Sequence, residues 1–195
     1  MQKWNSKLML ATAFVVGSLG LTGCTTTSGK PDTVATSASK AAAIDASVDA
    51  TLTRLYSTVK GSRELVSKSR GVLVFPEVIQ AGFIVGAQSG NGALRVGNHS
   101  VGYYNTSSLS VGLQAGAQSK AVVFLFMTQN ALDEFRGSEG WAAGAASSVA
   151  LVKMGANGAI DTTTAAAPVQ VVVMTNTGLM GDVSINGTKV TKLHL

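Results

Sequence analysis

The chain contains 195 residues, of which 13% are charged, 22 are glycine and one is cysteine. Its formal net charge of +5 at pH 7 is too small and too dispersed to indicate a nucleic-acid-binding protein. The lone cysteine excludes an internal disulfide, so the hydrophobic core has to stabilise the fold unaided. The length suits a single domain behind a short N-terminal leader.

The first 24 residues have the pattern of a secretory signal peptide. A basic start precedes an apolar stretch from Leu8 to Val16, and small residues then lead to Cys24. An apolar stretch of this length is too short to span a bilayer. We therefore predict a signal peptide over residues 1–23. The alternative is an ordinary buried cysteine behind an uncleaved apolar helix.

The run Leu21-Thr22-Gly23-Cys24 resembles the lipobox of bacterial lipoproteins. The resemblance implies cleavage before Cys24, diacylglycerol on its thiol and an acylated amino terminus. Two or more acyl chains hold a protein stably on a membrane, whereas one gives only marginal binding. Thr25 occupies the place where an aspartate commonly retains such lipoproteins in the inner membrane. By this analogy we expect an outer-membrane protein whose domain faces the periplasm.

Small polar residues fill the segment 24–39, which we predict to be a lipidated cysteine followed by a flexible tether. From about Lys40 to Arg70 apolar residues recur at helical spacing, which predicts an amphipathic helical segment. Gly61 interrupts the pattern, so two helices are an alternative to one. The apolar stripe consists of Ile44, Val48, Leu52, Leu55, Val59 and Val66.

Beyond Gly71 the pattern changes to that of strands. We expect strands over 72–75, ending at Pro76, and over 83–87 and 93–96, joined by a hairpin at Ser89–Gly92. Further strands are predicted over 101–105, 108–113, 121–127, 169–175, 178–183 and 185–195, with 121–127 in the centre of the sheet. Asn130 is expected to cap a short helix over 131–136, with Asp133 and Glu134 in its first turn. The predicted domain, 40–195, is α+β, with an antiparallel twisted sheet or partial barrel and an N-terminal amphipathic helical segment.

Several ordered motifs make residues 40–195 similar to the SYLF family. They are Ser69–Pro76, Ala81–Phe83 with Gly86, Gly112–Gln118, Ala131-Leu132 with Phe135, Gly178–Met180 and Gly187–Lys189. The resemblance implies lipid binding. Eukaryotic relatives bind phosphoinositides and related anionic lipids, some bind actin, and bacterial relatives are commonly lipid-binding envelope lipoproteins. The chain departs from the pattern at Tyr103–Asn105, where many relatives carry tryptophan and proline, and at Asn186, where an acid is common. Actin does not suit a bacterial envelope.

Basic residues are concentrated at the end of the helical segment. In the lipid-binding relatives such residues and the N-terminal helix are held responsible, so we expect five of them to bind phospholipid headgroups: Arg54, Lys60, Arg63, Lys68 and Arg70. Each basic residue near an anionic surface contributes about 1 kcal/mol. The alternative is that the stripe packs on the sheet and the charges only solvate the helix. The two interpretations are compatible if the apolar stripe belongs to the hydrophobic core and only the basic residues beside it face lipid.

Catalytic and metal-binding patterns are missing from the sequence. His99 and His194 have no partners at metal-ligand spacing and are predicted to lie on the surface, and no GxSxG motif is present. We therefore predict a non-enzymatic protein without metal or cofactor, and we place Trp141 in the core. The rival to a lipid-binding lipoprotein is a structural lipoprotein that contacts envelope proteins or peptidoglycan.

Overall fold

The computed structural model describes residues 33–82, 85–111, 116–143, 149–153, 160, 167–175, 178–179 and 187–195. Cys24, the predicted signal peptide and the first part of the predicted tether lie outside these residues. Residues 31–195 form one compact unit, separate from residues 1–30. The helices of this unit are α1 (Thr33–Thr58), α2 (Ser62–Lys68) and α3 (Gln129–Gly137).

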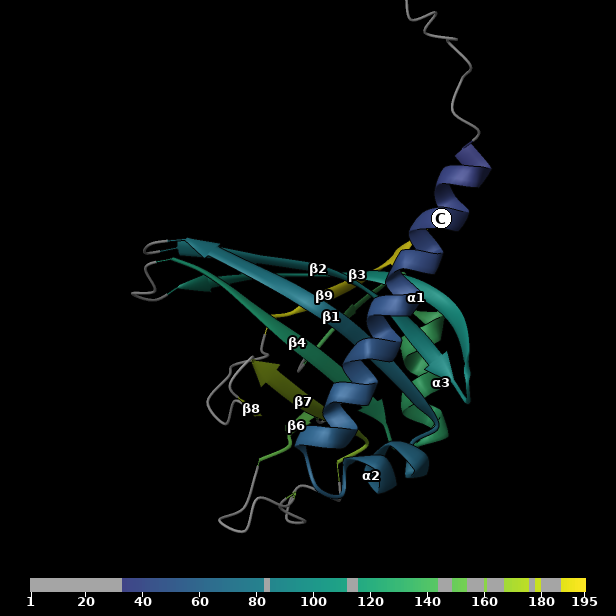
Figure 1. Cartoon of the computed structure of the whole chain (residues 1–195), viewed down its shortest axis with the longest axis vertical. Coiled ribbons are helices and arrows are strands. Elements are labelled where there is room, and N and C mark those ends of the chain that lie inside the picture. The colour runs from purple at the N-terminus through teal and green to yellow at the C-terminus, as the bar shows by residue number, and fades with distance from the viewer. Residues whose placement is uncertain are drawn as a thin grey trace, which may run out of the picture. The chain divides into compact units, whose positions relative to one another are not determined.

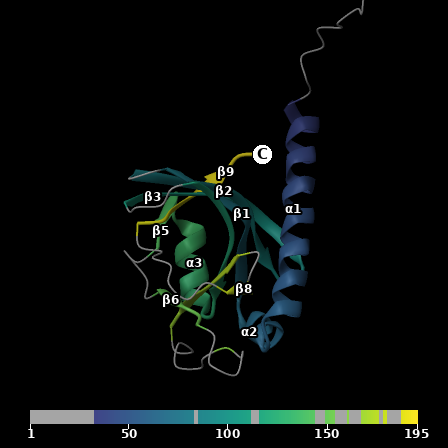
Figure 2. The same ribbon diagram turned by 60° about the vertical axis from the view of Figure 1, so that its left-hand side comes forward.

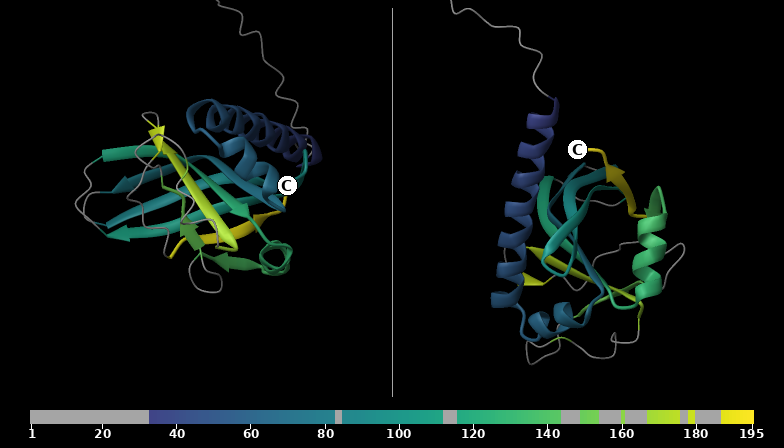
Figure 3. Two further views of the ribbon diagram at one scale, coloured as in Figure 1. Left: turned by 90° about the horizontal axis from the view of Figure 1, so that it is seen from below. Right: turned by 90° about the vertical axis from the view of Figure 1, so that its right-hand side faces the viewer.

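A single curled sheet holds the described strands (Figure 1). They are β1 (Gly71–Gly82), β2 (Val85–Val96), β3 (His99–Val111), β4 (Gly116–Phe126), β5 (Gly140–Ala142), β6 (Val149–Leu151), β7 (Val169–Thr175), β8 (Gly178–Leu179) and β9 (Lys189–Leu193). The order is β5-β9-β3-β2-β1-β4-β7-β6, with β8 on β7. Every pair is antiparallel except β6 with β7. The sheet bends around α3, while α1 lies against its outer face (Figures 2 and 3). The predicted α+β partial barrel is confirmed.

Two hydrophobic clusters cover the two faces of the sheet, because successive strand residues point to opposite sides. In β4, Phe124 and Phe126 belong to the cluster around α3, whereas Val123 and Leu125 belong to the cluster under α1. The α3 cluster also contains Leu73, Phe75, Leu94, Tyr104, Leu132, Phe135, Trp141, Val169 and Val171. The α1 cluster contains Val48, Leu55, Val59, Val72, Val74, Val172 and Met174.

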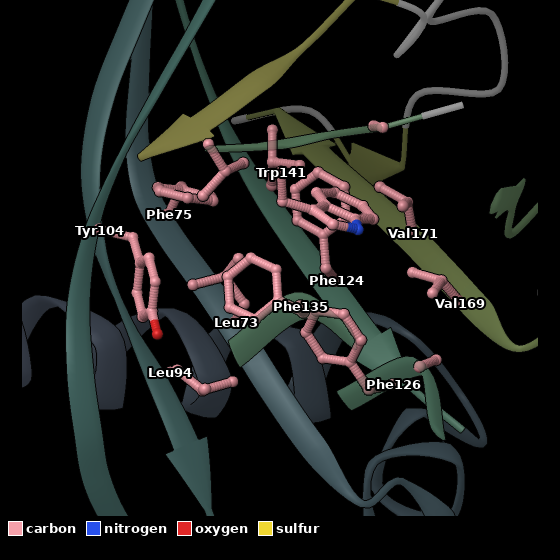
Figure 4. Packing of buried hydrophobic residues seen from close by; sticks show 14 of the residues in the cluster. Leu73, Phe75, Leu94, Tyr104, Phe124, Phe126, Phe135, Trp141, Val169 and Val171 are labelled. Carbon is pink, nitrogen blue, oxygen red and sulfur yellow. The ribbon is translucent and has the colours of Figure 1, made fainter. Parts of the chain in front are cut away.

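Trp141 lies at the centre of the α3 cluster, as predicted (Figure 4). Its side chain is 3% exposed. The indole ring meets Phe124, Phe126 and Phe135 in T-shaped contacts, with centroid distances of 5.7, 6.2 and 5.6 Å. Edge-to-face geometry is favourable between aromatic rings, so this cluster fixes α3 inside the curve of the sheet.

The N-terminal helical segment divides into two helices at Gly61, whose φ of +83° is left-handed and suits glycine. α1 begins at Thr33, earlier than the predicted start near Lys40. Residues 33–39 are therefore helical, and the prediction of a flexible tether is wrong for them. The apolar stripe packs on the sheet, because Val48, Leu55 and Val59 are buried.

The predicted end of the first strand at Pro76 is wrong, because β1 continues to Gly82. Its register shifts around Pro76 against both neighbours, between Val74 and Ile79 with β2 and between Phe75 and Val78 with β4. A β-bulge tolerates proline, since the bulged residue does not have to donate a ladder hydrogen bond. The bulge therefore lets one strand pass through a residue that normally ends strands.

The hairpin predicted at Ser89–Gly92 is also wrong, because β2 runs through it without a break. A Cβ atom at Gly92 would collide with the Val74 carbonyl oxygen and the Phe75 ring, and one at Gly90 would collide with the Glu77 carbonyl. These glycines thus permit close approach to the bulge in β1. The turn lies instead at Gly97-Asn98, where Gly97 has a φ of +62°.

The strands predicted over 101–105 and 108–113 form the single strand β3. Residues 121–127 were predicted to be central, and they correspond to β4, which pairs with β1 on one side and β7 on the other. β7 has the predicted bounds. The prediction of Asn130 as a cap is wrong. α3 begins at Gln129, and the Thr128 side chain accepts a hydrogen bond from the Ala131 N–H at 3.3 Å. This earlier start leaves Asp133 and Glu134 outside the first turn.

Candidate functional site

Two of the five predicted basic residues line one groove. The groove has a volume of about 460 Å³ and lies where α1, α2, the start of β1 and the β2–β3 turn meet. Arg63 and Arg70 line it together with Tyr56, Asp49 and Arg95. Sequence reasoning identified the first two residues, because they flank the apolar stripe.

Short-range contacts fix the positions of Arg63 and Arg70. The buried Ser62 hydroxyl donates to the carbonyl oxygens of Val59 at 2.7 Å and of Leu55 at 3.1 Å, which anchors α2 to the end of α1. The Arg70 N–H donates to the Phe126 carbonyl at 2.7 Å, where the chain joins the sheet. Both arginines are exposed, so a rigid backbone presents two guanidinium groups to solvent.

Arg63 stacks on Tyr56, with its guanidinium carbon 4.4 Å from the ring centroid. Such a cation–π contact holds the guanidinium while leaving its N–H donors free for a ligand. Burial raises the pKa of Tyr56, and the charge on Arg63 opposes that rise. The tyrosine therefore remains a neutral platform at physiological pH.

Arg95 is the groove residue that sequence reasoning missed. Its side chain is 13% exposed, and its guanidinium bonds the Asp49 carboxylate at 2.7 Å and the Asn98 carbonyl at 3.2 Å. The Asp45 carboxylate lies 3.7 Å away. A lone arginine in a strand gives no sequence signal of this kind, because its acidic partners lie far away along the chain on α1.

The Asp45 carboxylate joins α1 to β3 as well. It accepts hydrogen bonds from the Ser100 hydroxyl at 2.5 Å and the Tyr103 hydroxyl at 2.8 Å. Burial and this carboxylate raise the pKa of Tyr103. We call Asp45, Asp49, Arg95, Ser100 and Tyr103 the polar clamp. Arg95 pairs with Asp49, and neither Arg63 nor Arg70 forms an ion pair within the described part of the chain, so the groove keeps the positive charges of these two arginines.

The other three predicted residues are not in the groove. Lys68 forms an ion pair with Glu64 at 2.7 Å, between side chains that are 64% and 70% exposed. This bond and the lysine charge lower the pKa of Glu64. Lys60 is exposed. Arg54 lines a separate depression with Lys120, Glu77 and Ser119, and burial lowers the pKa of Lys120.

Metal-ligating side chains do not gather in the described residues, where no three of His, Cys, Asp and Glu lie close enough to hold an ion. His99 and His194 are exposed, as predicted.

The helices in the described ranges include none with the length and hydropathy to cross a membrane.

Comparison with known proteins supports the sequence resemblance. Residues 107–194 match the model of the family Ysc84, described as Las17-binding protein actin regulator. This domain family, also called SYLF, is known for lipid binding and actin regulation. No curated protein matches the chain. The match begins after the groove residues, in β3, and runs to the end of β9. Residues 107–194 are therefore similar to the SYLF-domain family, in agreement with the resemblance seen in the sequence.

Proposed function

We propose that this chain is a membrane-anchored bacterial lipoprotein whose SYLF domain binds anionic phospholipid headgroups without catalysing a reaction. The observation that carries the proposal is the groove that Arg63 and Arg70 both line, neither of them in an ion pair within the described residues. Arginine matches phosphate oxygens with a planar fork of N–H donors. The ligand class is therefore the phosphate of a lipid headgroup, including phosphoinositide-like headgroups.

The lipid anchor belongs to the same proposal. Acylation at Cys24 holds the domain at the outer membrane, on the periplasmic side. A tethered domain meets its ligand at high effective concentration, so weak contacts by two arginines are sufficient for occupancy. Most of the apolar stripe of α1 is packed on the sheet, and only its member Leu52 also lines the groove. Headgroup contact instead uses the basic residues Arg63 and Arg70, which line the groove. Lys60 precedes them in the sequence.

Charge reversal at the groove tests the proposal. Residues 25–195 contain the whole compact unit and lack the anchor, so their sedimentation with vesicles reports headgroup binding alone. We expect the double variant Arg63→Glu/Arg70→Glu to bind vesicles containing phosphatidylglycerol at least about 100-fold more weakly. Losing two cations costs about 2 kcal/mol, and two new anions add repulsion.

The matched control is Lys40→Glu/Lys153→Glu, which changes the net charge equally at exposed positions away from the groove. It should bind nearly as well as the unchanged chain. Equal weakening by both pairs would show that net charge, rather than the groove, attracts the lipid. Absence of binding by the unchanged chain at low salt would overturn the proposal and favour a lipoprotein that contacts envelope proteins or peptidoglycan.

A further inference from the structure

The ends of four strands form an uncharged lobe that projects beyond α3 (Figures 1 and 2). We call it the strand-end lobe and define it as residues 79–82, 85–89, 107–111 and 116–119. Its residues Ile79 and Ala87 line a separate groove of about 600 Å³ together with Ile44 of α1. Neighbouring strands are paired throughout the lobe. The sequence has no Asp, Glu, Lys or Arg over residues 78–94 or 100–119. The lobe is therefore ordered by backbone hydrogen bonds and has no charged side chains.

One face of the lobe carries exposed apolar residues beside a row of serines, Ser89, Ser107 and Ser119. Leu109 pairs with Ala87, which pairs with Ala81, so these side chains form one row on one face. Ile79 lies two residues from Ala81 and therefore on the same face. Leu109 is 78% exposed and Ile79 is 51% exposed, the two highest values among the large hydrophobic residues described. An exposed apolar surface without charge marks an interaction site.

Three basic residues lie beside the base of the lobe. Lys120 pairs with Val78 on β1, and Lys189 pairs with Ser107 on β3, so each outer edge of the lobe begins beside a lysine. Arg54 lines the same depression as Lys120. Glu77 is the single acid there. Apolar tips above basic residues match a membrane surface, where acyl chains lie beneath anionic headgroups.

We propose that the strand-end lobe inserts into the headgroup layer of an anionic phospholipid membrane. This inference rests on the proposed lipid-binding function, but it concerns a second surface at the opposite end of β1 from the groove. The lobe has a suitable length, because the four residue steps from Lys120 to Gly116 span about 14 Å. Interfacial helices insert by about 5–10 Å.

The depth is limited by the backbone of the outer strands. β7 pairs with β4 only over residues 121–126, and β9 pairs with β3 only over residues 103–107. In the described residues, the outer edges of the lobe therefore have no strand partner. Unpaired N–H and C=O groups are costly in hydrocarbon, so the lobe stays where water still reaches its edges.

A second copy of this chain fits the surface less well. A symmetric contact places the same patch on both partners, so it brings two sets of basic residues into one interface. Like charges at close range repel. Anionic lipid, in contrast, neutralises Arg54, Lys120 and Lys189.

A fluorescent label at Leu109 tests the insertion. Residues 25–195 contain no cysteine, so Leu109→Cys carries a single environment-sensitive fluorophore. A hexahistidine tag and a nickel-chelating lipid hold the chain on phosphatidylglycerol vesicles. We expect a blue-shifted emission that a lipid-borne quencher reduces. The matched control is Val101→Cys, which is also in β3 and is 44% exposed in the native residue but lies outside the lobe.

The tag holds the chain on the vesicle without help from the groove, so the label reports insertion of the lobe independently of headgroup binding by the groove. The labelled Arg63→Glu/Arg70→Glu chain should give the same blue shift while it is held by nickel, because the lobe inserts by itself. If the Leu109 label on bound chains behaves like the Val101 label, insertion is wrong even if the groove binds headgroups. A blue shift without vesicles that grows with protein concentration would identify a second copy as the partner and overturn the proposal.

A charge in the lobe provides an independent measurement. We expect Leu109→Asp to weaken sedimentation of the untagged chain with anionic vesicles about tenfold, which corresponds to about 1.4 kcal/mol. Val101→Asp adds the same charge to the same strand and should have little effect. Both positions are exposed, so circular dichroism should report an unchanged fold. Equal binding by the two variants would contradict insertion of the lobe.

Discussion

Glycine at position 92 determines how closely β2 approaches the bulge in β1. The Val74 carbonyl and the Phe75 ring occupy the space that a Cβ atom would need. Neither the backbone nor a buried ring can move away cheaply in a packed interior. The residue therefore has a packing role, although its sequence context, Ser-Gly-Asn-Gly, is typical of a turn.

We expect Gly92→Ala to lower the free energy of unfolding by about 3 kcal/mol, because overpacking forces strands apart. The matched control is Gly137→Ala at the end of α3, where nothing lies within 4 Å of the added Cβ. That change should be neutral or stabilise by up to about 1 kcal/mol. Urea denaturation measures both. A Gly92→Ala chain as stable as the control would contradict the close approach.

The Tyr103 hydroxyl gives the polar clamp a dependence on pH. Its pKa in the folded chain is raised above the ordinary value of 10.0. The unfolded chain therefore loses this proton first, and stability falls as the pH rises through the folded pKa. Burial also raises the pKa values of Tyr56 and Tyr104, so they contribute to the same alkaline loss.

We expect Tyr103→Phe to cost about 1 kcal/mol at pH 8, the value of one hydrogen bond to a partly exposed carboxylate. The difference from the unchanged chain should shrink above pH 10, because the unchanged chain loses the bond there. Urea titrations at pH 8 and pH 11 measure it. If the stability difference between the two chains is the same at pH 8 and pH 11, titration of Tyr103 does not break its hydrogen bond to Asp45, and the prediction is wrong.

At the scale of elements, α1 is a core helix, and the basic residues Lys60, Arg63 and Arg70 follow it in the chain. Its apolar stripe could be predicted from spacing alone, and so could its interruption at Gly61. The sequence could not show whether the stripe faces lipid or protein, because both environments select the same residues. The structure shows that it faces protein, since Val72, Val74 and Val123 of the sheet form the surface on which α1 packs.

Truncation along α1 tests this packing. We expect Leu55→Ala to destabilise the chain by about 3 kcal/mol, because it leaves a cavity in the α1 cluster. Leu52→Ala on the same helix, at a partly buried position, should cost roughly half as much. Thermal unfolding monitored by circular dichroism measures both. Equal, small effects would mean that α1 leaves the sheet in solution.

The strands were harder to predict than the helices. β4 and β7 are apolar on both faces, and such runs identify buried strands directly. β2 and β3 contain Gly, Ser and Asn at positions that resemble turns. Their continuity depends on partners far away in sequence, such as the bulge at Pro76, which local patterns do not contain. Arg63 and Arg70 could likewise be predicted from a helix, whereas Arg95 depends on the pairing of α1 with β2.

At the scale of the whole domain, β1 connects two surfaces with different chemistry. The groove lies at its beginning, near Gly71, and the strand-end lobe contains its end at Gly82. Twelve residues of strand span about 40 Å. A lobe that inserts end-on tilts β1 out of the membrane plane, so the groove at the other end of the strand lies away from the surface that the lobe enters. The uncharged lobe and the cationic groove therefore contact a flat membrane in different orientations of the domain.

The polar clamp has a mechanical consequence for a domain held by its N-terminal end. In the acylated form that we propose, a pull from Cys24 enters the compact unit through the start of α1. Asp45 and Asp49, which bond β3 and β2, lie near the middle of α1, next to the partly buried Ile44 and the buried Val48. Tension along the helix therefore reaches the polar bonds and the apolar packing together. The half of α1 that begins at Ile44 carries the attachment to the sheet.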